Sequence, residues 1–305
     1  MKTKFLSVLA LSSLLFVSCS NDNETPEVND GRVKFTSGIT AIPEVRVATD
    51  NAGSSTWNAN DPTGIYMVAN GSTTIAEGAE NIPYKATSSA ASTSFAASGA
   101  NIIYYPVNTP AKVDFVAYHP YNASVADWVY PVDVSTQTPQ TNIDLMYAKA
   151  TNANTGYDKT STNVDFAFSH QLVKLILNVS TSAGVTGTVS SVEITGMNTS
   201  AEFDLTGAAG LTNIATPQAI TLHEASAGTK YEAILLPITA LGTAHTATFT
   251  TNAGETYTWE MSDDISSLAP GSIYTYDITL TKYAINVTGN ITQWNIGSIG
   301  DGIAD

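Results

Sequence analysis

The feature that most constrains this chain is a series of short segments in which apolar and polar residues alternate. Residues 32–36 and 274–280 are clear examples, and clusters of Gly, Asn, Pro and Ser separate such segments. Alternation with a period of two is typical of a strand with one buried face, and no stretch has the pattern of a long amphipathic helix. The segments recur about every ten residues, which favours β-sandwiches. The sequence therefore predicts an all-β fold.

Composition and charge narrow the classes of protein further. The chain has 305 residues, which corresponds to about two domains of roughly 150 residues each. It carries 12 Lys and Arg against 27 Asp and Glu, a formal net charge of -15. Because such a chain repels phosphate backbones, nucleic acid is excluded as a partner. Thr, Val, Ile and Tyr are abundant, as expected of strands.

The longest strand-like segment runs from Val164 to Ser180 and changes its buried parity midway. The apolar residues from Val164 to Phe168 share one parity, whereas those from Leu175 to Val179 share the other. A strand whose buried face changes needs a bulge or bend, as when it passes between two sheets. The polar residues 149–163 before it are predicted to form a loop or an interdomain connection.

The N-terminal residues have the pattern of a secretory signal. Lys2 and Lys4 precede the apolar run 5–17, which is too short to span a membrane. The chain's only Cys, Cys19, follows directly after a small residue, an arrangement that resembles the lipobox of bacterial lipoproteins. We expect residues 1–18 to be removed and Cys19 to be lipidated. The alternative is a plain signal peptide followed by an incidental Cys.

The C-terminal tail is a separate feature. Its apolar residues fall on two parities, with Ile285, Val287 and Ile291 on one and Trp294 and Ile296 on the other. Trp294 and Ile296 lie beyond Gly289 and Asn290, a pair that is typical of a turn. We predict two short extended pieces that are joined at Gly289–Asn290.

No set of residues has the spacing of a catalytic, cofactor-binding or metal site. The four histidines, His119, His170, His223 and His245, do not form the closely spaced pairs that bind metals. His170 continues the parity of Phe168 and is predicted in the core or at its boundary, and His119, before Pro120, in a turn. We expect no enzyme, no cofactor and no metal.

Two weaker patterns leave a binding role open. Asp263 and Asp264 form an acidic pair that is more typical of a solvated turn or helix start than of a glycosidase dyad. The chain also has four Trp and 14 Tyr, which could form a sugar-stacking platform. Such aromatic residues more often fill sandwich cores and strand pairs.

Several blocks of sequence form an ordered series along nearly the whole chain. They are Cys19 in its lipobox, VKFTSG at 33–38, the W…D…GIYM pattern at 57–67, YYP at 104–106, VDFVAYHPY at 113–121, DLMYA at 144–148, FAFSHQLVKL at 166–175, and LAPGSIYTY at 268–276 followed by Trp294. This series resembles the fimbrillins of Bacteroidales, the subunits of the type V pilus. Each block alone is weak, and their order makes the resemblance specific.

The resemblance implies two transthyretin-like β-sandwich domains in tandem, made as a lipoprotein precursor. It also implies a cut after an arginine, which releases the lipid and the first strand, so that the vacated groove accepts a strand from another subunit. The implied parts are a signal peptide 1–18, a lipidated propeptide 19–46, an N-terminal domain 47–163 completed by 32–40 before cleavage, and a C-terminal domain 164–305 with a donor tail 283–305.

Arg46 fits the cleavage site that the resemblance implies. It is the only Arg between the first strand and the body of the domain, since the chain's other Arg is Arg32. A cut there makes Val47 the new N-terminus; the alternative is a surface arginine without a processing role. The donor strand would present Ile285, Val287, Ile291, Trp294 and Ile296 to its partner. The alternative for this tail is an ordinary last strand of its own subunit.

The expected function is that of a structural pilus subunit that supports adhesion. The implied partners are other fimbrillin subunits, the outer membrane through the lipid before cleavage, and an adhesion target on a host or a bacterium. The implied location is the cell surface as a precursor and then the fimbrium. A rival function is a surface lipoprotein that binds a glycan or host ligand. A fimbrillin that does not polymerise, acting as anchor or tip, is a further alternative.

Overall fold

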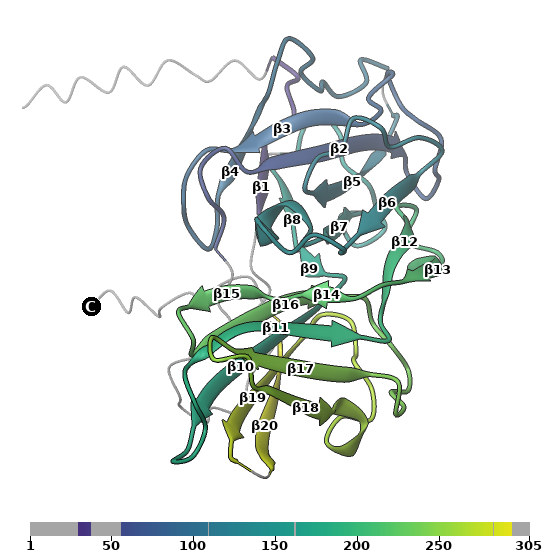
Figure 1. Cartoon of the computed structure of the whole chain (residues 1–305). Helices are drawn as coiled ribbons and strands as arrows, with labels where there is room; N and C mark the ends of the chain where they lie inside the picture. The colour runs from purple at the N-terminus through teal and green to yellow at the C-terminus, as the bar shows by residue number, and fades with distance from the viewer. Residues whose placement is uncertain (1–29, 38–55, 109, 162, 283, 295–305) are drawn as a thin grey trace, which may run out of the picture. The chain divides into compact units, whose positions relative to one another are not determined.

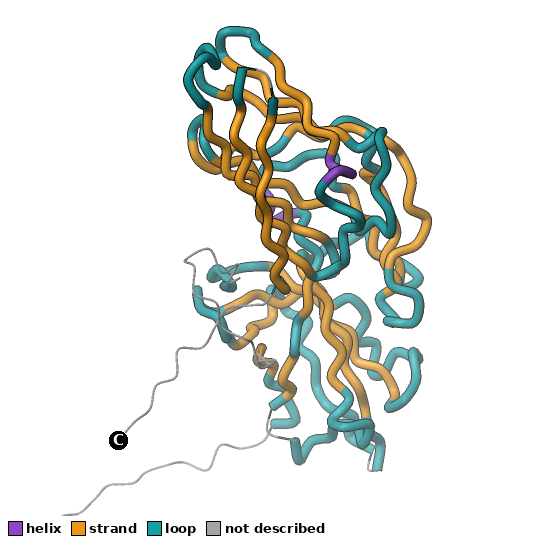
Figure 2. The backbone as a smooth tube through the Cα atoms, turned by 90° about the horizontal axis from the view of Figure 1, so that it is seen from below, coloured by secondary structure: helices purple, strands orange, loops and turns teal. Residues whose placement is uncertain are grey.

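The structure is a computed structural model of the chain and describes residues 30–37, 56–108, 110–161, 163–282 and 284–294. These residues form strands joined by loops, which confirms the predicted all-β fold (Figure 1; Figure 2). The helical elements among them are two single turns of 3-10 helix, η1 (Gln140–Asn142) and η2 (Met261–Asp263). In this part of the chain no helix has the length and apolar character needed to cross a membrane.

The first half of the chain builds an eight-stranded sheet. Its strands lie in the order β8 (Val164–Phe166), β1 (Phe35–Ser37), β4 (Ser94–Ala97), β3 (Ile82–Ala86), β2 (Pro62–Ala69), β5 (Val113–His119), β7 (Met146–Ala150) and β9 (Ser169–His170). All neighbours are antiparallel except β8 and β1, which are parallel. One core of this half is rich in aromatic rings, including Phe35, Trp57 and Phe115.

The second half forms a sandwich of two sheets. The larger sheet contains β15 (His223–Ser226), β16 (Lys230–Leu235), β10 (Val173–Thr181), β19 (Ser272–Leu280) and β20 (Ile285–Gln293), and the smaller one contains β14 (Ile220–Thr221), β11 (Val189–Thr195), β17 (Thr246–Thr251) and β18 (Thr256–Glu260), each in that order. Leu177, Phe249 and Trp259 are among the side chains buried in their common core.

A third, smaller sheet joins strands from both halves. Its members are β13 (Leu211–Pro217), β12 (Asn198–Asp204) and β6 (Val129–Asp133) in that order. Nearby, the Gln137 side chain accepts a hydrogen bond from the Ile234 backbone N–H at 2.7 Å and donates one to the Ile234 carbonyl at 2.9 Å. It thereby satisfies backbone groups of β16 that no strand pairs. The predicted domain boundary between residues 163 and 164 stays a prediction.

The segment 164–180 changes its buried face as predicted, but it forms three strands rather than one. Phe166 in β8 belongs to the aromatic core of the first half, whereas Leu175 and Leu177 in β10 belong to the core of the second. The chain leaves the strand conformation after Phe166 and again after His170. These two interruptions provide the bend that the change of parity requires.

The prediction of a turn at Gly289–Asn290 is wrong. β20 runs unbroken through both residues and pairs with β19 over its whole length, with Gly289 opposite Tyr276. A Cβ added to Gly289 would lie 2.2 Å from Cε1 of the Tyr276 ring. The glycine therefore makes room for the ring of its cross-strand partner, and it does not reverse the chain.

The prediction that His119 lies in a turn is also wrong. His119 is the last residue of β5, is 4% exposed, and its Nδ1 lies 2.8 Å from the Pro62 carbonyl oxygen. Pro120 ends the strand only after His119, so His119 itself remains in β5.

Candidate functional site

The candidate site is the slot that holds β1 between β4 and β8 (Figure 1). Phe35 lies opposite Phe95 on the antiparallel strand β4 and opposite Val164 on the parallel strand β8. Because both of its edges are paired, β1 is an interior strand of the sheet although it is only three residues long.

The side chains that β1 and the residues just before it direct inward are almost fully buried. Val33, Phe35 and Ser37 are 3%, 1% and 2% exposed. The Phe35 ring meets Tyr84 edge-on at 5.1 Å and Phe115 edge-on at 5.2 Å. It also stacks with Phe166 at 5.5 Å. Removing this segment therefore exposes an aromatic core and not merely a strand edge.

Backbone hydrogen bonds hold the same segment at several points. Val33 donates to the Ile103 carbonyl at 3.0 Å, and Ser37 donates to the Thr93 carbonyl at 2.8 Å. In the opposite sense, Val164 donates to the Lys34 carbonyl at 2.9 Å. Without this segment, these neighbouring backbone groups lose their partners, and unpaired backbone groups at a sheet edge favour pairing with another strand.

The last described strand, β20, has the opposite environment. It forms an edge of the five-stranded sheet and pairs with β19 alone among the described strands. None of its nine residues is charged. Ile285 and Val287 are half-buried, whereas Ile291 is 58% exposed. These three predicted donor residues share one face of the strand, and little of that face is buried.

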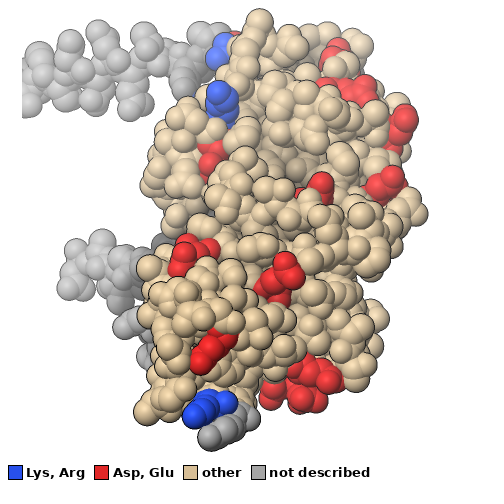
Figure 3. Space-filling model, in the orientation of Figure 1, with Lys and Arg blue, Asp and Glu red and all other residues tan. Residues whose placement is uncertain are grey.

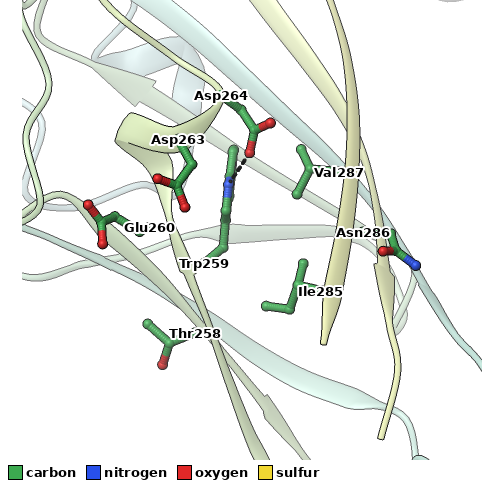
Figure 4. A pocket seen from close by; sticks show the side chains of 8 residues that line it. All are labelled: Thr258, Trp259, Glu260, Asp263, Asp264, Ile285, Asn286 and Val287. Carbon is green, nitrogen blue, oxygen red and sulfur yellow. Dashed lines mark hydrogen bonds between the residues drawn. The ribbon is translucent and has the colours of Figure 1, made fainter. Parts of the chain in front are cut away.

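A groove separates β20 from β18, the edge strand of the smaller sheet (Figure 4). It has a volume of about 330 Å³ and is lined by Thr258, Trp259, Glu260, Asp263, Asp264, Ile285, Asn286 and Val287. Trp259 donates a hydrogen bond from its indole N–H to Asp264 at 2.8 Å. Asp263 is the last residue of η2, Asp264 follows it, and both are exposed, which fits the predicted solvated turn and not a helix start.

Trp294, just beyond β20, is held differently from the strand itself. It is 6% exposed and stacks on the imidazole of His170, with ring centroids 3.8 Å apart and planes 8° apart. Nδ1 of His170 lies 2.8 Å from a carboxylate oxygen of Asp144. His170 itself is 3% exposed, which confirms its predicted core or boundary position. The sequence offers no signal for these contacts, because the three residues meet only through the fold.

Most other candidate residues are explained by packing. Trp57, Trp259 and Trp294 are buried, and Trp128 stacks on Tyr66 at 4.4 Å. These rings therefore fill cores rather than form an exposed sugar platform. In the described part of the chain, no group of three or more His, Cys, Asp and Glu could hold a metal ion.

Two pKa shifts show how strongly burial acts in these cores. Burial lowers the pKa of His119 below its usual value, and the Pro62 carbonyl and nearby Asp61 only partly oppose this effect. Burial likewise raises the pKa of Tyr130 to about 12. Both groups are thus neutral at pH 7.

On the face seen in Figure 3, acidic side chains are spread over the molecule and basic ones are few. A partner of similar charge is therefore recognised more readily by backbone pairing and apolar contacts than by opposite charge.

Four of the predicted site residues lie outside the described part of the chain. They are Cys19, Arg46, Val47 and Ile296. The structure thus brings together the first strand and its slot, and it describes the C-terminal strand on its own subunit. It leaves the predictions of lipidation and cleavage as predictions.

Comparison with known proteins gives consistent matches over the described fold. A family profile described as fimbrillin-like matches residues 46–294. A protein of Bacteroides uniformis, provisionally named fimbrium subunit Fim1C, is 37% identical over 312 residues, which cover 98% of each chain.

Two solved structures also resemble this chain. A crystal structure from Bacteroides uniformis, provisionally described as a cell adhesion protein, is 33% identical with a TM-score of 0.72, covering 87% of this chain and 99% of the other. A second one with the same description, from Bacteroides ovatus, is 21% identical with a TM-score of 0.64. It covers 88% of this chain and 99% of its own, and at this identity it supports the fold alone.

Proposed function

The chain belongs to the fimbrillin-like family, and we propose that it is a fimbrial subunit that is exported as a lipoprotein, cleaved after Arg46 and polymerised by strand exchange. Fimbrial and cell adhesion roles are also what the names of its relatives from Bacteroides uniformis describe. On this proposal its partners are other fimbrillin subunits, and its final location is the fimbrium on the cell surface.

The observation that carries the proposal is the interior position of β1. Its Phe35 is 1% exposed among three aromatic rings, and both strand edges are paired. A subunit that loses this strand exposes apolar surface and unpaired backbone groups together. An extended strand from a second subunit corrects both defects at once, which provides a driving force for assembly.

The proposed processing step links the lipid to this strand. Cys19 and β1 both precede Arg46 in the chain, so one cut after Arg46 separates both from the rest of the subunit. The lipid holds the precursor at the outer membrane, and the cut frees it and opens the slot in a single event. The chain that remains begins at Val47 and contains no Cys and no Arg.

β20 has the side chains that a replacement strand needs. β1 and the residues before it direct Val33, Phe35 and Ser37 into the slot, in the order apolar, apolar, small. On its core-facing side β20 presents Ile285, Val287 and Gly289, in the same order. We therefore propose that β20 enters in the direction of β1, with Val287 at the position of Phe35.

This alignment is tested with engineered cysteines in pili sheared from cells that produce the full precursor. In β1, Thr36 lies opposite Ser94 of β4, and in the proposed alignment Thr288 takes the place of Thr36. The pair Ser94→Cys and Thr288→Cys is expected to give a ladder of disulfide-linked subunits. The matched control, Ser94→Cys with Thr292→Cys, places the second thiol on the same face four residues further on and is expected to give none.

The N-terminal sequence of the shed subunit tests the processing step directly. A chain that begins at Val47 supports cleavage and polymerisation. A shed or surface form that still begins at acylated Cys19 argues against both for this subunit, and a non-polymerising anchor or tip role then replaces the proposal.

The rival function, a glycan- or host-ligand-binding surface lipoprotein, has less support. Its expected binding platform is reduced because Trp57, Trp259 and Trp294 are buried. Strong binding of the isolated subunit on a glycan array would favour this rival over a purely structural role.

A further inference from the structure

The most deeply buried side chain at this end of the chain is not in β20 but belongs to the residue that follows it, Trp294. None of the nine residues of β20 is buried, and Ile291 is 58% exposed. Trp294, in contrast, is 6% exposed. Because apolar burial is the main stabilising contribution of a side chain, the side chain of Trp294 adds more to the backbone ladder with β19 than any side chain within β20.

Trp294 is fixed from two sides. Its indole lies flat on the imidazole of His170 at 3.8 Å, and its backbone N–H donates to the Gly271 carbonyl at 2.7 Å. His170 cannot turn freely beneath it, because its Nδ1 lies 2.8 Å from Asp144. The Trp294 indole thus stacks on the His170 imidazole, whose orientation is fixed by the Asp144 carboxylate.

These contacts lie where the two halves of the fold meet. His170 belongs to β9, the last strand of the eight-stranded sheet, and Gly271 directly precedes β19 of the five-stranded sheet. The Gly271 N–H donates to the Leu172 carbonyl at 2.9 Å, and Gln171 donates to the Leu145 carbonyl at 2.9 Å. The site that holds the Trp294 indole, which we call its seat, is therefore formed by segments of both sheets and not by the C-terminal sandwich alone.

We propose that Trp294 is a latch: seated on His170 it keeps β20 on its own subunit, and leaving that seat frees the strand for donation. This inference rests on the proposed donor role of β20. It assigns to Trp294 the control of when the strand is available, and to Ile285, Val287 and Ile291 the contacts with the next subunit. The apolar face of β20 can thus stay half-exposed on its own subunit, and the strand is still not released before it is donated.

The latch is tested by hydrogen exchange of the purified full chain. Trp294→Leu is expected to speed amide exchange across β20 by about tenfold or more, while β10 in the centre of the same sheet changes little. Trp294→Phe, which keeps an aromatic ring on His170, is expected to restore most of the protection. The control Ile291→Ala, on the exposed part of the strand, is expected to change exchange less than about threefold.

A second variant keeps the test valid if Trp294→Leu folds poorly. His170→Ala removes the seat and leaves Trp294 in place, and it is expected to give the same selective loss in β20. Equal loss of protection in β10 and β20 in both variants overturns the latch, because Trp294 is then an ordinary core residue. Unchanged exchange in β20 overturns it as well.

Assembly in cells separates this inference from the proposed function. Faster exchange in β20 together with an altered yield of polymer supports both. Faster exchange with pili of unchanged amount and length supports the latch and overturns the donor role of β20.

Discussion

The first and last described strands differ in how they are held, although each lies near one end of the chain. β1 has three residues, and the side chains it turns inward are among the most deeply buried of the molecule. β20 has nine residues and a full ladder with β19, yet none of its side chains is buried. Burial of apolar surface, rather than strand length or the number of hydrogen bonds, decides which strand the fold cannot lose.

On the proposed strand exchange, this difference suits the two strands to opposite roles in assembly. A strand in the position of β1 has to be replaced when it leaves, because its departure opens the aromatic core around Phe35. A strand in the position of β20 takes no fully buried side chain of its own away from the core. The comparison therefore predicts large effects from changes in the first strand and small ones from changes in the last.

The largest effect is expected for Phe35→Ala in the full chain. The change removes a ring from the centre of the aromatic core and is expected to lower the free energy of unfolding by about 3–5 kcal/mol. Urea unfolding followed by aromatic fluorescence measures it. A loss as small as that of a surface substitution would mean that β1 is not an interior strand in solution.

An intermediate effect is expected for Ser37→Ala at the end of β1. Ser37 is 2% exposed, and its hydroxyl oxygen accepts a hydrogen bond from the Thr93 backbone N–H at 3.1 Å. Removing the hydroxyl leaves that buried donor without this partner, at a cost of about 1–3 kcal/mol. Ser37→Thr, which keeps the hydroxyl, is the matched comparison in the same unfolding assay, and it should recover part of the loss.

Low pH is expected to lower the stability of the first half of the fold more than that of β20. Burial lowers the pKa of His119 in the folded state, so the unfolded chain binds the proton more readily. Stability is therefore lost as pH falls below about 6.5, by at most about 1.4 kcal/mol per pH unit, until the folded-state pKa is reached. His119→Asn should abolish this part of the pH dependence. An unchanged slope between pH 7 and 5 would contradict the assignment.

The smallest effect is expected for Ile291→Ala in β20. The side chain is 58% exposed, so the free energy of unfolding is expected to change by less than about 0.5 kcal/mol. The same urea titration used for Phe35→Ala measures it, which allows a direct comparison of the two strands. A loss of 2 kcal/mol or more, about the range of buried aliphatic truncations, would show that β20 is packed more tightly than its exposure indicates.

Strands with strong alternation could be predicted from the sequence, and weakly patterned ones could not. β19 follows from apolar residues at every second position and β5 from a nearly continuous apolar run, whereas β4 is only four residues long and has one large apolar side chain, Phe95. β13 has no buried residue, so it leaves no periodic signal at all. Gly289 was misleading, because a glycine beneath an aromatic partner and a glycine in a turn look alike in one sequence.

The candidate site was predictable only in part, for a similar reason. The buried alternation of Val33 and Phe35 is local, so the first strand could be recognised from its own residues. The stacking of Trp294 on His170 depends on the path of the whole chain between them, which no local pattern encodes. The predictions for Cys19 and Arg46 stay predictions, because they concern chemistry at residues outside the described part.

The pairing of β1 with strands on both sides also has a mechanical meaning. β4 and β8 flank it along its length, one antiparallel and one parallel. A donated strand in this position that is pulled along its own axis loads both hydrogen-bond ladders in shear, so that many bonds must fail together rather than one after another. In a fibre built by such exchange, each joint would resist tension, whereas a strand held at a single edge and peeled from one end would open bond by bond.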